Sequence, residues 1–210
     1  MTIDLYTWAT PNGRKTSVML EEVGLPYTEH AINISKGDQF EPEFLKISPN
    51  NRIPAIVDPD GPDGSPISVF ETGAILIYLG EKTDKFIPTD ARKRVAAMEW
   101  LMWQMGGFGP MLGQAHHFLG LDTEVPYGSE RYVKESHRLY GVMDRRLADN
   151  EYLAGDEYSI ADIACYPWAH RHPRHKVDIS QFENVQRWYD AIGVRPAVQK
   201  GMPTLSGINM

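Results

Sequence analysis

The chain has very little cysteine, with Cys165 as the single one among 210 residues. An internal disulfide and a Cys-x-x-Cys redox pair are therefore excluded, so any thiol chemistry must use a sulfur that a substrate supplies. Cys165 follows Ser159 and Asp162, whose spacing is that of a capping box at the start of an apolar helix. A cysteine in such a helix is usually a small buried side chain, and we expect it to be no nucleophile.

Clusters of positive charge and long apolar runs are also missing. The formal net charge is −7 and no segment is rich in Lys and Arg, so we expect neither nucleic acid nor a membrane as a partner. The apolar stretches are too short to cross a bilayer, and the N-terminal residues lack a basic leader followed by an apolar core. A cytoplasmic protein is therefore expected.

Strand-like and helix-like segments alternate in the first part of the chain, and the order they predict is β-α-β-α-β-β-α. These segments are Ile3–Thr7, Lys15–Val23, Tyr27–Ile34, Pro42–Ile47, Pro54–Asp58, Ile67–Phe70 and Glu71–Lys82. After Asp90 only helical patterns remain, in Ala91–Met105, Gly128–Leu147, Ser159–Trp168 and Asn184–Ile192. The change near Lys82–Thr89 predicts one domain over residues 1–84 and an all-helical one over 91–210.

This architecture, with Ile53-Pro54 before the third strand and Phe70-Glu71-Thr72 opening the next helix, resembles the glutathione transferase superfamily. Within it the chain looks like the bacterial nu-class disulfide-bond reductases, and the globular domain of a yeast nitrogen regulator is similar too. The strings that carry this narrower resemblance are Thr10-Pro11-Asn12-Gly13, Ile47-Ser48-Pro49-Asn50-Asn51, Gly106-Gly107-Phe108-Gly109-Pro110-Met111 and His116-His117-Phe118. The resemblance implies a fold of class α/β plus all-α: a thioredoxin-like glutathione-binding domain and a C-terminal helical bundle.

The resemblance also implies which residues bind glutathione. Glu71 and Thr72 lie where a strand ends and a helix begins, so their backbone N–H groups favour a carboxylate. We expect them to hold the γ-glutamyl end, although both residues would also serve as a plain helix cap. Ile53, before a proline that the resemblance implies is cis, would bind the cysteinyl part through its backbone. Gln39 and Arg52 match positions that reach the glycine carboxylate.

The sulfur of glutathione would lie near Thr10 and Asn12, at the start of the first helix. A thiol at a helix N-terminus has a lowered pKa, and a hydrogen bond from either side chain would stabilise the thiolate further. We favour Asn12 over Thr10 as the donor, although Thr10 has an alternative role as a helix N-cap. Tyr6, the rival thiol activator, lies inside the first strand and is expected to be structural.

Two further patterns have competing interpretations. The run His170-x-His172-x-x-His175 suggests a metal, but Arg171 and Arg174 within it would repel a cation, so we expect none. The glycines from Gly106 follow helical sequence rather than a strand, which favours a kinked helix over a dinucleotide loop. Trp103, Phe108 and Met111 would then contact a second substrate. The residues alone predict no role for His116 and His117 beyond packing.

The function that the resemblance implies is a glutathione-dependent disulfide reductase. Bound glutathione would attack a small disulfide, and the site would hold two thiols or one glutathione disulfide. Conjugation of glutathione to small electrophiles is the enzymatic alternative. The alternative from another functional class is a non-enzymatic regulator. It is disfavoured because the chain starts directly at the first strand. The family further implies a homodimer in which Arg131 reaches the partner subunit's glutathione site.

Overall fold

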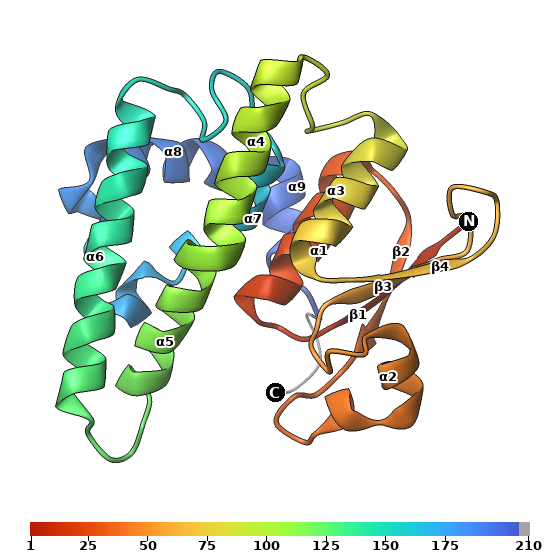
Figure 1. Ribbon diagram of the computed structural model, residues 1–210, viewed down its shortest axis with the longest axis horizontal. Coiled ribbons are helices and arrows are strands. Elements are labelled where there is room, and N and C mark those ends of the chain that lie inside the picture. The colour runs from red at the N-terminus through yellow and green to blue at the C-terminus, as the bar shows by residue number, and fades with distance from the viewer. Residues whose placement is uncertain (206–210) are drawn as a thin grey trace. The chain divides into compact units, whose positions relative to one another are not determined.

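A computed structural model describes residues 1–205 of the chain (Figure 1). The chain divides into two compact units: Met1–Lys85 with the described residues from Arg195 onward, and Phe86–Val194. The first unit contains a mixed sheet with helices, and the second is helical. The predicted fold class is thus confirmed. Within residues 1–205, none of the helices has both the length and the apolar character needed to cross a membrane.

Four strands form the sheet of the first unit: β1 (Ile3–Thr7), β2 (Tyr27–Ala31), β3 (Ala55–Asp58) and β4 (Ile67–Phe70). Their order is β2-β1-β3-β4, with β1 parallel to β2 and β3 antiparallel to both β1 and β4. The second strand ends at Ala31 rather than at the predicted Ile34. The backbone turns there because Asn33 N donates to Asp38 Oδ2 at 2.9 Å, a local side-chain bond that replaces strand pairing.

Helices cover both faces of this sheet. They are α1 (Pro11–Val23), α2 (Pro42–Ile47), α3 (Thr72–Thr83) and α9 (Pro196–Gly201), with a 3₁₀ turn η1 (Asp38–Phe40). Figure 1 shows α1 beside α3, with α2 on the other side of the sheet. The sequence analysis missed α9, which packs closely on α1: Ser17 Oγ donates to Gly201 O at 2.8 Å. A Cβ atom at Gly201 would lie 2.6 Å from Val18 Cα, so glycine permits this contact.

The second unit consists of helices joined by short turns. Its elements are α4 (Ala91–Trp103), a π turn η2 (Gln104–Phe108), α5 (Gly109–Leu119), α6 (Pro126–Ala148), α7 (Ile160–Ala169), the 3₁₀ turns η3 (His172–His175) and η4 (Ile179–Gln181), and α8 (Glu183–Gly193). Gly106 and Gly107 lie in the π turn, and the chain continues helically into α5. Phe108 is fully buried, so the expectation that it contacts a substrate is wrong.

Asp162 organises the core of the helical unit. Its carboxylate accepts hydrogen bonds from Leu153 N at 2.9 Å, Ser159 N at 3.0 Å, Ser159 Oγ at 3.1 Å and Trp188 Nε1 at 2.9 Å. Burial raises the pKa of Asp162, and these four donors oppose that effect by stabilising the ionised form. The capping box predicted for Ser159 and Asp162 is confirmed, and it ties the start of α7 to the preceding loop and to α8.

We expect Asp162→Ala to lower the free energy of unfolding by at least about 3 kcal/mol, because it leaves several buried donors without an acceptor. Urea denaturation of the variant measures this loss. Asp156→Ala, which removes an exposed carboxylate of the same unit, is the control and should change the stability little. Equal losses in the two variants would contradict the central role of Asp162.

Candidate functional site

One edge of the sheet gathers three segments that are far apart in the sequence. Ala55, the first residue of β3, pairs with Tyr6 of β1 and with Phe70 of β4, both in antiparallel register. The start of β3 and the ends of β1 and β4 therefore meet at the same edge. As a result, Ile53 just before β3 and Glu71 just after β4 lie near the start of α1, which follows β1.

A cavity of about 140 Å³ lies at this edge. The residues that line it are Asn12, Ser48, Arg52, Ile53, Pro54, Phe70, Glu71 and Thr72. The structure thus brings together Asn12, Arg52, Ile53, Glu71 and Thr72, all of which the sequence analysis selected as site residues. Thr10, Gln39 and Arg131 do not line this cavity. The Ile53–Pro54 peptide bond is cis, as the resemblance implied.

Two helix N-termini border the cavity. Helix α1 contributes Asn12 from its first turn, and α3 begins at Thr72. Helix α1 has no acidic residue in its first turn, and at α3 the one nearby carboxylate is that of the N-cap residue Glu71, which makes no capping hydrogen bond to the helix. The backbone N–H groups of both first turns and the positive ends of the helix dipoles therefore remain available to a ligand. The cavity is therefore suited to bind negatively charged groups.

Thr10 is the N-cap residue of α1, and its Oγ accepts a hydrogen bond from Gly13 N at 3.2 Å. The predicted capping role of Thr10 is confirmed, and its hydroxyl hydrogen can still be donated elsewhere. Gly13 lets α1 start this close to the strand, because a Cβ atom there would lie 2.1 Å from Trp8 O. The same turn presents Asn12 to the cavity.

Glu71 connects β4 to α3 in a conformation that non-glycine residues rarely adopt, with φ 71° and ψ 120°. Its side chain makes no capping hydrogen bond to the helix; instead Glu71 Oε1 accepts from Asn50 Nδ2 at 3.2 Å. A role as a plain helix cap therefore does not explain the residue. Backbone strain of this kind is retained where the surrounding structure needs the conformation, and it concentrates at functional sites.

The turn that carries Arg52 is fixed by Ser48. Ser48 is fully buried, its Oγ donates to Arg52 O at 2.8 Å, and its carbonyl accepts from Asn51 N at 2.9 Å. Sequence reasoning included Ser48 and Asn50 only within a family string and gave neither a role. The hydrogen bond from Asn50 to Glu71 joins residues 21 positions apart in the sequence. No periodicity or spacing in the sequence predicts it.

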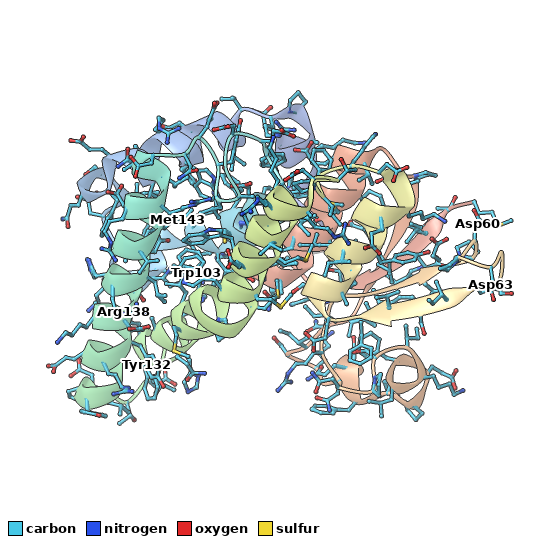
Figure 2. All side chains as sticks on the ribbon, turned by 45° about the horizontal axis from the view of Figure 1, so that its top comes forward. Asp60, Asp63, Trp103, Tyr132, Arg138 and Met143 are labelled. Carbon is cyan, nitrogen blue, oxygen red and sulfur yellow. The ribbon has the colours of Figure 1, made fainter. Side chains whose placement is uncertain are left out.

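The remaining predicted binding residues lie elsewhere. Gln39 in η1 is buried; its Nε2 donates to Ile34 O at 3.4 Å, while its Oε1 is buried and accepts no hydrogen bond within residues 1–205. Arg131 lies on α6 and lines a separate cavity of about 690 Å³ in the helical unit, together with Tyr132 and Arg138. Figure 2 labels the latter two along that helix.

The rival candidates for sulfur chemistry are placed unfavourably. The ring of Tyr6 stacks on His30, with ring centroids 4.7 Å apart, and burial, with a contribution from Asp4, raises its pKa. Its position within β1 and its stacking on His30 fit a structural role. Cys165 forms no disulfide and has no exposed surface, in agreement with the expectation of a buried side chain. Among residues 1–205, no group of three or more His, Cys, Asp or Glu side chains is arranged to hold a metal ion.

Comparisons with known proteins agree with this geometry. Residues 9–82 match the family model described as the glutathione S-transferase N-terminal domain, and residues 117–196 match the C-terminal domain. The chain belongs to the glutathione S-transferase family. It is 49% identical to the disulfide-bond oxidoreductase YfcG of Escherichia coli (strain K12), an alignment that covers 95% of this chain and 94% of that relative. The predicted family and its disulfide-reductase branch are thus confirmed.

Solved structures of other glutathione transferases match over nearly the whole chain. One, from Burkholderia graminis, is 46% identical with a TM-score of 0.92, and the match covers 99% of this chain and 90% of that one. It contains two bound glutathione molecules per subunit. One from Pseudomonas putida is 45% identical with a TM-score of 0.92, covers 98% and 92%, and contains one glutathione disulfide per subunit. Glutathione in both states is therefore a ligand of transferases with this fold.

The strain at Glu71 predicts opposite effects of alanine and glycine at two positions. Glu71→Gly should be more stable than Glu71→Ala by about 1 kcal/mol, because only glycine adopts a positive φ without a Cβ clash. At the exposed helical position Glu99 the order should reverse, with glycine about 1 kcal/mol less stable than alanine. Urea denaturation of the four variants measures both differences. If the alanine variant is more stable than the glycine variant at both positions, Glu71 is unstrained.

Proposed function

We propose that this transferase is a glutathione-dependent disulfide-bond reductase. The observation that carries the proposal is the cavity bordered by the N-termini of α1 and α3, where Asn12 faces Glu71 and Thr72 across a small anion-binding space. Residues 1–84 would form the glutathione-binding domain and residues 91–210 the helical domain. Glutathione is the co-substrate, held as two thiols or as one disulfide.

In this proposal the α3 end of the cavity binds the γ-glutamyl group. The Thr72 hydroxyl and N–H take the α-carboxylate, favoured by the helix dipole, and the Glu71 carboxylate takes the α-ammonium. Asn50 already holds Glu71 Oε1, which leaves Oε2 for the ligand. Ile53 precedes the paired part of β3, which starts at Ala55, and its backbone groups bind the cysteinyl residue as an added strand would.

The glycine end of the tripeptide and its sulfur use the remaining residues. Arg52 and Gln39 bind the glycine carboxylate, and the unpaired Gln39 Oε1 accepts a peptide N–H. The sulfur lies at the N-terminus of α1, where the helix dipole lowers the thiol pKa. Asn12, which lines the cavity, donates a hydrogen bond to the thiolate. Thr10, which does not line it and whose Oγ accepts from Gly13 N as the helix cap, is the secondary donor.

The reaction is two thiol–disulfide exchanges. The bound glutathione thiolate attacks one sulfur of a small disulfide, forms a mixed disulfide and releases the other half as a thiolate. A second glutathione thiolate then attacks the glutathione sulfur of the mixed disulfide, which gives glutathione disulfide and a second thiolate. The two glutathione molecules bound per subunit in the Burkholderia graminis transferase and the one glutathione disulfide in that of Pseudomonas putida support this pair of states. We propose the cytoplasm as the location, since glutathione is kept reduced there.

Single substitutions separate the two sources of sulfur. Asn12→Ala should lower kcat/KM for glutathione-dependent reduction of a small disulfide by about tenfold or more, because a hydrogen bond to an anion is lost. Thr10→Ala should cost less. Cys165→Ala, which changes a buried thiol without adding a polar group, should keep the activity. Full activity in Asn12→Ala with loss in a folded Cys165→Ala would overturn the proposal, and turnover of aryl halides but not of disulfides would favour conjugation.

We also propose that the protein is a homodimer. The outer face of α4 exposes Val95 and Met102, 58% and 51% accessible and two turns apart, and Tyr127 at the start of α6 is 74% accessible. Exposed apolar side chains of this kind favour burial against another copy. Arg131 on α6 lines the cavity of the helical unit beside Tyr127, and it would reach the glutathione site of the partner subunit.

Sedimentation tests the dimer directly. The wild-type chain should sediment at twice its mass of 23.8 kDa, and Met102→Asp should sediment as a monomer because a charge would be buried at the interface. Val194→Asp is the matched control, since Val194 is also an exposed apolar residue of the helical unit, 70% accessible, but lies beyond α8. A wild-type monomer at working concentration would contradict the proposal.

A further inference from the structure

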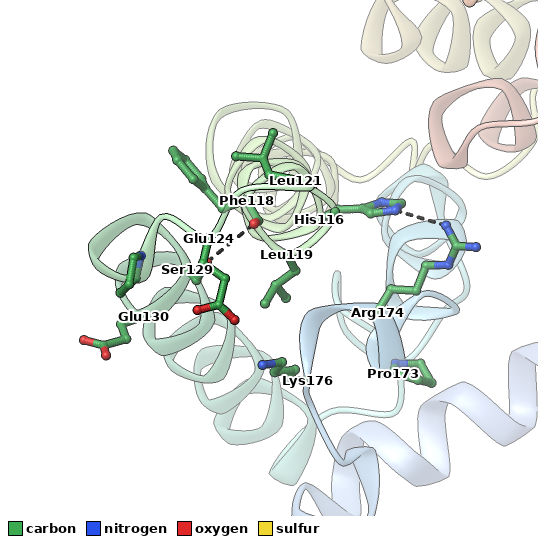
Figure 3. A pocket seen from close by; sticks show the side chains of 12 residues that line it. His116, Phe118, Leu119, Leu121, Glu124, Ser129, Glu130, Pro173, Arg174 and Lys176 are labelled. Atoms are coloured by element: carbon green, nitrogen blue, oxygen red, sulfur yellow. Dashed lines mark hydrogen bonds between the residues drawn. The ribbon is translucent and has the colours of Figure 1, made fainter.

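A second large cavity lies within the helical unit, apart from every residue used above. It has a volume of about 650 Å³ and lies between the end of α5, the loop that leads into α6, and the η3 turn. Figure 3 shows this cavity from close by, with His116, Leu119, Glu124, Pro173, Arg174 and Lys176 among the residues around it. Its volume is that of a small-molecule site, roughly 300–1,000 Å³.

The η3 wall of the cavity is cationic. Arg174 and Lys176 both line it, and neither makes an ion pair with a carboxylate within residues 1–205. Arg174 Nη1 donates to His116 Nε2 at 3.1 Å, which requires that ring nitrogen to be an acceptor. Burial, with Arg174 and Arg171 nearby, lowers the pKa of His116. His116 is therefore neutral at pH 7 and orients Arg174 without adding charge.

The opposite wall is acidic. Glu124 precedes α6 and Glu130 lies on its second turn, and both line the cavity. Neither carboxylate has a cationic partner within residues 1–205. Figure 3 shows Glu124 and Lys176 among the residues that surround the open space, with Arg174 across it from Glu124. The cavity therefore presents two cations and two carboxylates that do not neutralise one another, with Leu119 and Pro173 as apolar surface between them.

Lys176 is also held in a specific backbone conformation. It has a φ of 55°, in the left-handed region that non-glycine residues rarely occupy. Its carbonyl accepts from His137 Nε2 at 3.1 Å, and the next carbonyl, that of Val177, accepts from His172 Nδ1 at 2.9 Å. Two histidines thus fix the segment that carries the lysine. Lys176 is the C-cap residue of η3, a position where a left-handed conformation ends the turn, and its backbone is held in place beside the cavity.

We propose that this cavity binds a zwitterionic α-amino acid with an apolar side chain. Arg174 and Lys176 bind its carboxylate, Glu124 binds its ammonium, and the side chain contacts Leu119 and Pro173. A simple organic anion would satisfy the cationic wall but would bring its own charge towards Glu124 and Glu130, and a simple amine would do the reverse. Only a ligand with both charges matches both walls.

Titration calorimetry with L-phenylalanine and two truncated analogues tests the charge pattern. L-Phenylalanine should bind the wild-type protein, whereas 3-phenylpropionate, which lacks the ammonium, and 2-phenylethylamine, which lacks the carboxylate, should each bind about tenfold more weakly or worse. An absence of phenylalanine binding at millimolar concentration would overturn the proposal. Equal affinity of either analogue would overturn it as well, since one wall would then be unused.

Charge-neutral variants locate the site. Lys176→Gln and Glu124→Gln should each weaken phenylalanine binding about tenfold. The exposed control variants Lys36→Gln and Glu151→Gln, which remove the same charges away from the cavity, should leave it unchanged. Glutathione binding should be the same in all four, and urea denaturation checks that each is folded. Wild-type phenylalanine affinity in both cavity variants would show that the amino acid binds elsewhere. Failure of glutathione binding in the wild type would contradict only the proposed reductase.

Discussion

The pairing of Ala55 with both Tyr6 and Phe70 is the constraint on which the candidate site depends. It brings the start of β3 and the ends of β1 and β4 to a single edge of the sheet. Helix α1 follows β1 and helix α3 follows β4. The helix N-termini of α1 and α3 meet at the cavity for this reason. A shift of the β3 register would move Ile53 away from Glu71 and would also reverse the buried and exposed faces of the strand.

The residues at this edge are arranged for binding rather than for stability. Glu71, the N-cap residue of α3, has a strained backbone and makes no capping bond to that helix, and α1 lacks an acidic residue in its first turn that would stabilise it. Each omission leaves donors or positive potential available to a ligand.

Sequence patterns predicted the order of strands and helices in the first unit and the helices that begin near Ala91, Gly128, Ser159 and Asn184, since these have strong periodicity or clear caps. They also selected most residues of the cavity, chiefly through the family strings. The glycines of η2, interpreted as a kinked helix, do lie in a π turn through which the chain continues helically. Sequence patterns failed at α9, which is short and depends on its contact with α1. The bond between Asn50 and Glu71 and the cavity beside η3 were unpredictable because they join residues with no shared local pattern.

The absence of an accessible cysteine determines what the protein has to supply for disulfide chemistry. Cys165 has no exposed surface and lies in α7, all of whose residues are buried, so the protein contributes no attacking sulfur. A reaction that uses a sulfur from the ligand needs the ligand held in place and its thiolate stabilised. In the proposed site, Glu71 and Arg52 would hold the two ends of the tripeptide, and Asn12 would stabilise the thiolate by a hydrogen bond. Such groups remain unchanged in charge and covalent structure through each exchange. A site of this kind therefore returns to its starting state when glutathione disulfide leaves, without a reduction step of its own.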